Sequence, residues 1–240
     1  MKVVSLFSGA GGLDLGFKKA GFDIVWANEF DKSIWDTFRY NFPETTLDTR
    51  SITDVKSADI PDADGIIGGP PCQSWSEAGA GRGIDDKRGK LFYEYIRILD
   101  DKKPKFFLAE NVSGILLPRH RNAFNSIVED FSSIGYDVQW SLLNASHYGV
   151  PQDRKRVIII GFSNDIDVSY RYPAPLFRPV TLKDAIGSLP PPLPALQYNK
   201  ANNPDNLAMP NHEYMNGGFS TIYMSRNRVR GWDEVSFTIQ

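Results

Sequence analysis

The chain has a single cysteine, Cys72, and the residues around it are suited to present a reactive thiol. An apolar run, Gly65-Ile66-Ile67, precedes Gly68-Gly69-Pro70-Pro71 and predicts a buried strand. Because proline fixes φ and donates no backbone hydrogen bond, the paired prolines end that strand and set the direction of the next residues. A lone cysteine can also be a small buried hydrophobe. The polar run Gln73-Ser74-Trp75-Ser76 instead predicts a loop facing solvent, which favours a functional thiol.

A second candidate site lies at the start of the chain. A strand over Val3–Phe7 is followed by a glycine-rich loop, a helix over Leu13–Ala20 and a strand over Asp23–Ala27, which is the first unit of a nucleotide-binding α/β sheet. Glu29 lies 20 residues after Gly9, the usual separation for a carboxylate that binds ribose hydroxyls. Asp14 stands where the dinucleotide fingerprint has its third glycine, so no pyrophosphate is implied.

The rest of the first 165 residues alternates between strand and helix, which predicts a doubly wound, mostly parallel sheet. Carboxyl ends of strands are where ligands bind in such sheets. The expected elements are a helix capped by Asp31, a short strand near Leu47–Ile52, a helix over Leu91–Leu99, a strand over Lys105–Ala109 that delivers Glu110-Asn111-Val112, a helix over Phe124–Ile134, and strands over Tyr136–Leu142 and Val157–Gly161. The glycine-rich segment Gln73–Lys90 predicts a mobile lid beside the thiol.

The composition changes after residue 170. Residues 171–240 hold 9 of the 16 prolines, and 7 Lys/Arg against 5 Asp/Glu, whereas the whole chain has a net charge of −2. We therefore predict a domain over 1–170 and a small, irregular second domain over 171–240, with helical signal at Leu182–Leu189. Basic residues cluster at 154–156 and at 226–230, which keeps nucleic acid open as a ligand.

The overall composition is that of a globular protein, with 41% hydrophobic and 23% charged residues. No apolar run approaches the ~18 residues of a membrane span, and the N-terminus lacks a signal-peptide pattern. One cysteine excludes an internal disulfide and a cysteine-rich zinc site, so we expect a cytoplasmic protein without a metal.

Four motifs in order give a specific resemblance: Phe7-Ser8-Gly9-x-Gly11-Gly12, Pro70-Pro71-Cys72-Gln73, Glu110-Asn111-Val112 and Gln152-x-Arg154-x-Arg156. The chain resembles the bacterial DNA cytosine-5 methyltransferases from Met1 to Gln240. Within them it is most similar to the Hae-type modification methylases that recognise GGCC, through Gly79–Leu99 and Met224–Trp232.

The resemblance implies a catalytic centre built on Cys72. The thiolate would attack carbon 6 of a flipped-out cytosine in duplex DNA, which activates carbon 5 as a nucleophile. Glu110 would act at the cytosine N3, where a donating carboxyl must be neutral. Arg154 and Arg156 would hold the base and its phosphate. The implied substrate-binding residues are Gln73, Ser76, Gln152, Arg226, Arg228 and Arg230, of which the three arginines alternate along an extended segment.

The methyl donor implied by the resemblance is S-adenosylmethionine. Glu29 would bind its ribose hydroxyls, Phe30 would stack on the adenine, and Leu91 would help to close the pocket. The other implied contacts are Phe7, Gly9, Gly11, Leu13, Ser51 and Ile52. Arg50-Ser51-Ile52 replaces the family's usual Gly-Asp-Ile, so a charge is lost at the adenine amino group.

The resemblance also stops partway into the family's ninth conserved segment, at Ser236–Gln240. A split enzyme, with the rest of the recognition domain and the last motif on a separate chain, is one interpretation; a truncated, non-catalytic remnant is another. In either case we expect residues 1–240 alone to aggregate, to bind cofactor weakly and to transfer no methyl groups. An RNA cytosine-5 methyltransferase of the same fold is the alternative enzyme, whereas a nicotinamide-dependent oxidoreductase gives no role to Pro70-Pro71-Cys72.

Overall fold

The computed structural model describes residues 1–71, 90–176, 178–196, 206–207, 209, 212–214 and 230–238. Contacts between residues divide the chain into two compact units. Unit 1 comprises Met1–Leu143 with Lys155–Pro173, and unit 2 comprises Asn144–Arg154 with Ala174–Gln240. The division near residue 173 lies close to the boundary predicted at 170, but the segment Asn144–Arg154 groups with the second unit.

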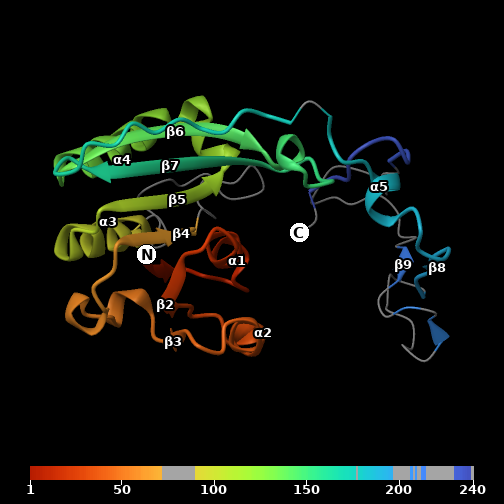
Figure 1. Ribbon diagram of the computed structural model, residues 1–240, viewed down its shortest axis with the longest axis horizontal. Helices are drawn as coiled ribbons and strands as arrows, with labels where there is room; N and C mark the ends of the chain where they lie inside the picture. The colour runs from red at the N-terminus through yellow and green to blue at the C-terminus, as the bar shows by residue number, and fades with distance from the viewer. Residues whose placement is uncertain are drawn as a thin grey trace. The chain divides into compact units, whose positions relative to one another are not determined.

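Unit 1 is built on one seven-stranded sheet with the order β3-β2-β1-β4-β5-β7-β6 (Figure 1). Its strands are β1 (Lys2–Leu6), β2 (Asp23–Asn28), β3 (Thr46–Asp48), β4 (Gly65–Gly68), β5 (Phe106–Val112), β6 (Tyr136–Asn144) and β7 (Lys155–Ser163). The pairs β3-β2, β2-β1, β1-β4 and β4-β5 are parallel, and β5 pairs with β7 in the antiparallel sense. The predicted doubly wound, mostly parallel α/β fold is therefore confirmed.

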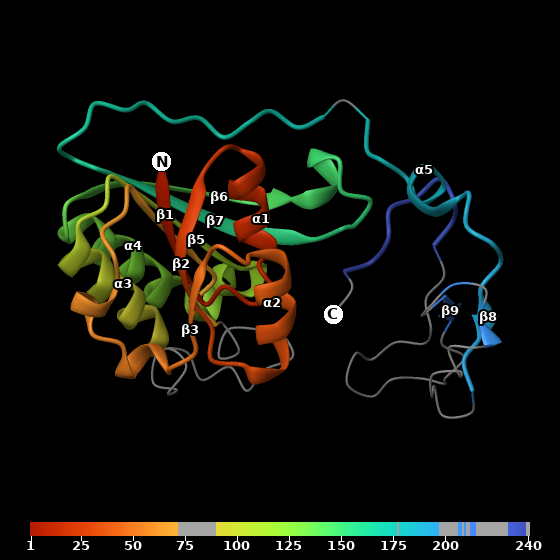
Figure 2. The same ribbon diagram turned by 60° about the horizontal axis from the view of Figure 1, so that its bottom comes forward.

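Helices cover both faces of this sheet (Figure 2). One face carries α1 (Gly12–Lys19) and α2 (Trp35–Asn41), and the other carries α3 (Lys90–Lys102) and α4 (Arg121–Ser133). Short 3-10 turns join the elements: η1 (Lys32–Ile34), η2 (Ile52–Asp54), η3 (Ser57–Asp59), η5 (Ser113–Leu116), η6 (Pro118–His120) and η7 (Ala145–Tyr148). Alternate residues of a strand point to opposite faces, so Val3 and Ile67 pack under α1 whereas Val4 and Ile66 pack under α3.

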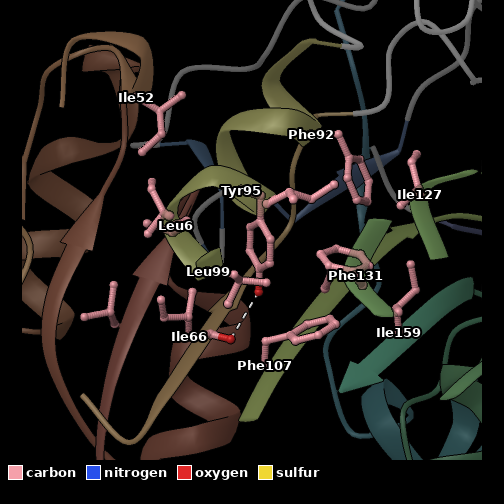
Figure 3. Close-up of a cluster of buried hydrophobic side chains, with 14 of the residues drawn as sticks. Leu6, Ile52, Ile66, Phe92, Tyr95, Leu99, Phe107, Ile127, Phe131 and Ile159 are labelled. Carbon is pink, nitrogen blue, oxygen red and sulfur yellow. Dashed lines mark hydrogen bonds between the residues drawn. The ribbon is translucent and has the colours of Figure 1, made fainter. Parts of the chain in front are cut away.

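The larger core lies between the sheet and α3 and α4 (Figure 3). Its aromatic centre is Phe107, whose ring lies 4.4 Å from that of Phe131 and 6.3 Å from that of Tyr95. Tyr95 is fully buried, and its hydroxyl lies 3.1 Å from the carbonyl of Ile66 and 2.9 Å from that of Leu108. Because burying a hydroxyl costs free energy unless it is hydrogen-bonded, these contacts let a tyrosine occupy the apolar face predicted for this helix.

Several predicted element boundaries are confirmed and two are wrong. Asp31 caps η1 by accepting from Ser33 N, as predicted, and Gly21 follows α1 with φ 88°. The strand expected near Leu47–Ile52 ends at Asp48, because the chain turns there and Ile52 begins η2. The strand expected to end at Ala109 runs on to Val112, because its last three residues pair with β7.

In unit 2, short elements are held by local capping and side-chain contacts. Helix α5 (Leu182–Ile186) begins with a capping box in which Thr181 and Asp184 exchange hydrogen bonds. The strands β8 (Leu193–Pro194) and β9 (Glu213–Tyr214) form a two-stranded parallel pair. Strand β8 lies in the proline-rich part of the chain after residue 170. A bridge joins Gln152 to Ser236, so the two segments that make up unit 2 are connected.

Candidate active site at the carboxyl ends of the strands

The glycine-rich loop after β1 and the carboxylate after β2 meet, as their spacing predicts. The Glu29 carboxylate accepts from Gly9 N at 2.8 Å and from Asp31 N at 2.7 Å. The loop itself needs left-handed backbone at Phe7 (φ 55°), Gly9 and Gly11. A left-handed conformation is uncommon for a phenylalanine and costs of order 1 kcal/mol, so the loop is held by its surroundings. The tight packing is clearest at Gly11, where an added Cβ would lie 2.2 Å from the Phe42 ring.

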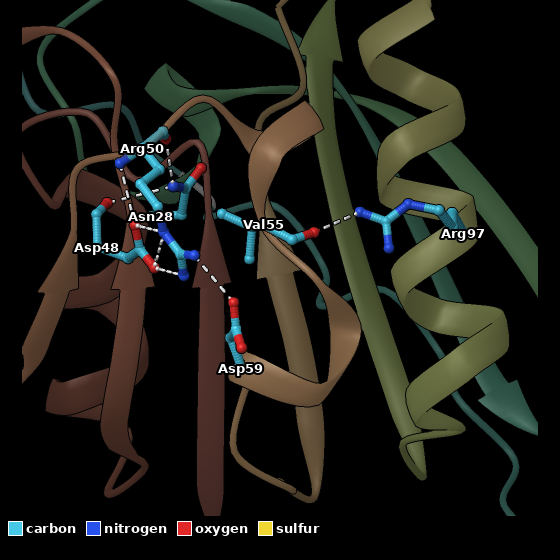
Figure 4. A network of polar contacts seen from close by, with 6 residues as sticks. All are labelled: Asn28, Asp48, Arg50, Val55, Asp59 and Arg97. Atoms are coloured by element: carbon cyan, nitrogen blue, oxygen red, sulfur yellow. Dashed lines mark hydrogen bonds and ion pairs between the residues drawn. The ribbon is translucent and has the colours of Figure 1, made fainter.

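The end of β3 is tied to the end of β2 by Asn28, which is 1% exposed (Figure 4). Its side-chain amide donates to the carbonyls of Asp48 (3.2 Å) and Arg50 (2.9 Å). On the solvent side, the Arg50 guanidinium binds Asp48 (2.6 Å) and Asp59 (2.9 Å). This pairing lowers the pKa of the Asp48 carboxyl and raises that of Arg50. The turn that carries Ser51 and Ile52 is thus fixed from two sides.

The other predicted cofactor residues differ in how they are presented. Phe30 is 69% exposed and can stack on a ligand. Leu91 is partly buried against the larger core, and Leu13 is partly buried against the smaller cluster of Val3, Ile24, Ile67 and Phe106. The Ser51 hydroxyl lies 2.8 Å from that of Thr53. Ile52 is 3% exposed, and its side chain belongs to the core between the sheet and α3. Any contact of Ile52 with a cofactor therefore comes from its backbone or the edge of its side chain.

The residues that lead to Cys72 are attached to the end of β5. The Asn111 amide, 2% exposed, donates to the carbonyl of Pro70 at 3.3 Å. A Cβ added to Gly69 would lie 3.3 Å from Glu110 Oε2, so this glycine lets the backbone pass close to the carboxylate. The strand end before Cys72 and the Glu110 carboxylate are therefore neighbours, as the sequence predicted.

Glu110 is paired with Arg156 in the structure. Val112 lies opposite Arg156 across the β5-β7 pair, so Arg156 and Glu110 are diagonal neighbours on one face. Their side chains form an ion pair with Arg156 Nε 2.7 Å from Glu110 Oε1, and they are 21% and 30% exposed. A guanidinium at this distance stabilises the ionised carboxylate over the neutral form. The Glu110 carboxylate is thus held by a guanidinium from the neighbouring strand.

The described part of unit 2 contains one residue predicted to be catalytic, Arg154, and two predicted to bind substrate, Gln152 and Arg230. Gln152 forms the bridge to Ser236, and Arg154 N donates to the Asn144 side chain at 3.0 Å. Arg230 donates to Glu234 at 3.0 Å, and its guanidinium carbon lies 4.0 Å from the centre of the Phe237 ring. These contacts order the Arg230 side chain within its own unit. Five predicted site residues lie outside the described residues: Cys72, Gln73, Ser76, Arg226 and Arg228. The predicted lid over Gln73–Lys90 also lies outside them, except for the backbone of Lys90, which begins α3.

Two buried polar residues of this region are not predicted as site residues by the sequence. Asn28 follows the apolar part of β2 directly, and its partners lie 20 and 22 residues further along the chain, so only the fold reveals them. Asp14, which departs from the dinucleotide fingerprint, is fully buried in the first turn of α1. Neither of its carboxylate oxygens has a hydrogen-bond partner among the described residues. Burial raises its pKa to about 6, which the nearby Ser5 hydroxyl partly opposes.

Two other classes of site are not found among the described residues. None of the described helices is both long and apolar enough to cross a membrane. In the same part of the chain, no group of three or more His, Cys, Asp or Glu side chains is placed to hold a metal ion.

Comparisons with known proteins identify the family of the chain. The family model described as C-5 cytosine-specific DNA methylase matches residues 1–240. Among curated relatives, the Type II methyltransferase M.MthTI of Methanothermobacter thermautotrophicus is 56% identical over all of this chain and 72% of its own length. M.NgoPII of Neisseria gonorrhoeae is 55% identical, with 71% of its length covered.

Solved structures give the same result. A chain described as a DNA modification methyltransferase from a prophage (E. coli) has a TM-score of 0.70 at 35% identity, over 81% of this chain and 57% of its own. A DNMT2 mutant of Spodoptera frugiperda has a TM-score of 0.60 at 28% identity, over 72% and 53%. The chain thus spans little more than half the length of these two structures. With a family model matched over every residue and relatives more than half identical, the chain belongs to the C-5 cytosine-specific DNA methylase family.

Proposed function

We propose that the protein transfers a methyl group from S-adenosylmethionine to carbon 5 of a cytosine in duplex DNA, within the sequence GGCC. The observation that carries this proposal is the juxtaposition of Glu110 and Arg156 with the strand end that leads to Cys72. These are the residue types that cytosine activation needs: a nucleophile for carbon 6, an acid at N3 and a cation for a carbonyl or phosphate. The GGCC target rests on the resemblance of Gly79–Leu99 and Met224–Trp232 to methylases of that specificity.

The residues at the other strand ends fit the cofactor. The Glu29 carboxylate, ordered by Gly9 N and Asp31 N, can accept from ribose hydroxyls, and the exposed Phe30 ring can stack on adenine. Ser51, Ile52 and Leu91 would complete the pocket around the base. When bound, the cofactor supplies an electrophilic methyl group on a positively charged sulfur.

The reaction then follows from the chain's own residues. The Cys72 thiolate would form a bond to carbon 6 of the cytosine, and the ring electrons would move to carbon 5. Carbon 5 would take the methyl group as the sulfur–methyl bond breaks, and the sulfur would keep that electron pair as a neutral thioether. Glu110 stabilises the charge at N3, and Arg156 stabilises Glu110 when the base is absent. Loss of the carbon 5 proton to a base then lets the Cys72–carbon 6 bond break and restores the thiolate. In this scheme residues 1–170 perform catalysis and residues 171–240 contribute to target recognition.

The test is transfer of a labelled methyl group to a GGCC duplex, a scrambled duplex and a structured RNA. It is run with the 240-residue chain alone and mixed with the C-terminal segment of M.NgoPII that lies beyond the matched region. With the 240-residue chain alone we expect no label. With the C-terminal segment added we expect label only on GGCC DNA, and none with Cys72→Ala. A GGCC duplex with 5-fluorocytosine at the target should become covalently attached to the wild type. Transfer that survives Cys72→Ala would disprove the nucleophile, and label on RNA alone would favour the RNA methyltransferase.

A further inference from the structure

We infer that Asn28 is a positioning residue that sets the geometry of the ribose-binding and adenine-binding segments together. This inference rests on the proposed function, because it takes Glu29 and Ser51 as parts of the cofactor site. Asn28 is the last residue of β2 and stands directly before Glu29. Among the described residues, only one other polar side chain in β1, β2 and β3 is buried as deeply as Asn28, and that is Ser5 of β1.

The first step of the argument is the backbone around Asn28. Its carbonyl accepts from Ser8 N at 3.1 Å, so it is bonded to the start of the glycine loop. The next residue, Glu29, donates its N–H to the carbonyl of Asp48 at 3.0 Å and holds Gly9 through its carboxylate. Residues 28 and 29 therefore connect the ends of all three strands in this half of the sheet.

The second step is the side chain of Asn28. Parallel pairing of β2 with β3 ends at the pair Asn28 and Asp48, so the Arg50 carbonyl beyond that point needs a partner outside the ladder. The Asn28 amide donates one N–H group to it and the other to the Asp48 carbonyl, which also accepts from Glu29 N. The Arg50 carbonyl belongs to the same planar peptide group as Ser51 N, so its hydrogen bond also fixes the direction of the Ser51 backbone.

The third step is the choice of an amide at this position. A carboxylate of the same shape would place a negative oxygen against two carbonyl oxygens, and a serine is too short to reach both. Each change removes the side-chain donor of the partly buried Arg50 carbonyl and leaves the Asp48 carbonyl with Glu29 N alone, which is unfavourable. The turn that carries Ser51 would then move away from Glu29. The consequence expected is weaker cofactor binding with an intact fold, because the hydrogen bonds of the Asn28 side chain reach the end of β3 and the turn after it, and none of α1 to α4.

The experiment compares Asn28→Asp and Asn28→Ser with the wild type. Asn41→Asp is the matched control: it makes the same change at an exposed asparagine of α2, whose amide donates to the carbonyl of Thr37. S-adenosylmethionine binding is measured by titration calorimetry, and the fold by circular dichroism and thermal melting. We expect both Asn28 variants to raise the Kd about tenfold or more and to keep the wild-type spectrum, with Asn41→Asp unchanged.

A second measurement separates positioning from general weakening. In the combination with Glu29→Gln, Asn28→Asp should weaken binding far less than it does alone, because both changes act on one arrangement. In steady-state assays with the C-terminal segment added, Asn28→Asp should have a higher KM for S-adenosylmethionine than the wild type. Its kcat at saturation should stay within about twofold of the wild-type value.

The outcomes are distinguishable. If the wild type does not bind S-adenosylmethionine, the proposed function fails and this inference fails with it. If the wild type binds and Asn28→Asp binds equally well, only the inference is overturned. Unfolding of both Asn28 variants, or additive losses with Glu29→Gln, would show that Asn28 is structural and would also overturn it.

Discussion

At the ends of β1, β2 and β3 the polar side chains of the candidate site bind backbone groups, whereas its two charged side chains on β5 and β7, Glu110 and Arg156, are joined to each other by an ion pair. Glu29 accepts from two backbone amides and Asn28 donates to two backbone carbonyls. Glu110 and Arg156 instead form an ion pair, although Arg156 also donates to the carbonyl of Lys155, and both side chains are partly exposed. Backbone partners cannot rotate away, but a guanidinium on a flexible stem can. Under the proposed function, the cofactor half of the site, at the ends of β1, β2 and β3, is thus formed before any ligand binds, and the base half, at β5 and β7, is able to exchange partners.

The largest effect that this comparison predicts comes from changing Glu110. Glu110→Gln keeps the shape of the side chain but removes the charge that pairs with Arg156 and the acid expected at N3. We expect methyl transfer to fall by about 10²–10⁴-fold, the usual contribution of a general acid or base. S-adenosylmethionine binding should change by less than about twofold, because the cofactor half does not contain this pair.

Glu94→Gln is the control for that change, because Glu94 also forms a partly exposed ion pair with an arginine, Arg97, at 2.8 Å. Transfer rates from single-turnover assays and Kd values from titration give the two numbers needed. If Glu110→Gln weakened cofactor binding and transfer equally, Glu110 would be a structural residue and the two halves would not be independent.

Asp14 is the exception within the cofactor half, because it is a buried carboxyl without a hydrogen-bond partner among the described residues. Its pKa is raised from 3.8 to about 6 by burial, so folding favours its protonated form. The stability that this group contributes is fully present below pH ~4 and is lost as the pH rises through about 6. A shift of this size corresponds to about 3 kcal/mol of unfolding free energy.

Asp14→Asn replaces the carboxyl with a neutral group of the same shape, which tests the argument. The stability of the wild type relative to Asp14→Asn should fall between pH 4 and pH 7, as measured by urea unfolding at each pH. Asp36→Asn is the control, since Asp36 occupies the first turn of α2 with a fully exposed side chain. A constant difference between wild type and Asp14→Asn over this range would mean that Asp14 does not titrate in the folded state as expected.

The sequence predicts the strand ends of this site well because the signals for them are local. Gly9, Glu29 and Glu110 each stand directly after an apolar run or in the loop next to one, and the parallel sheet brings such positions to one edge. The structure accordingly places Gly9 against Glu29, and Glu110 beside the strand end of Gly69. The roles of these residues in catalysis and in cofactor binding stay predictions.

The features that the sequence does not predict depend on register and on turns. The partner of Glu110 is Arg156 only because β7 runs antiparallel to β5 in a particular register. The resemblance implies that Ile52 contacts the cofactor, but β3 ends early and the 3-10 turn directs its side chain into the core. The role of Asn28 depends on the carbonyls of Asp48 and Arg50, which lie 20 and 22 residues further along the chain. No local sequence pattern indicates these partners.

The smallest effect is expected at Arg50, which contacts the same turn as Asn28 but from the solvent side. Its guanidinium is 46% exposed, although it is bonded to both Asp48 and Asp59. Exposed ion pairs contribute little, because water and salt screen them and ordering long side chains costs entropy. The turn also keeps its buried support from Asn28, and Arg97 holds the following segment by donating to the carbonyl of Val55 at 3.0 Å.

Arg50→Ala should therefore change the Kd for S-adenosylmethionine by less than about threefold, and lower Tm by no more than a few degrees. Arg178→Ala is the control, because Arg178 forms an exposed ion pair with Asp184 far along the chain. Raising the salt concentration should narrow the difference between Arg50→Ala and the wild type, since exposed charges are the ones that salt screens. If Arg50→Ala instead weakened binding as much as Asn28→Asp, the turn would depend on the exposed ion pairs, and the buried amide would not be its main support.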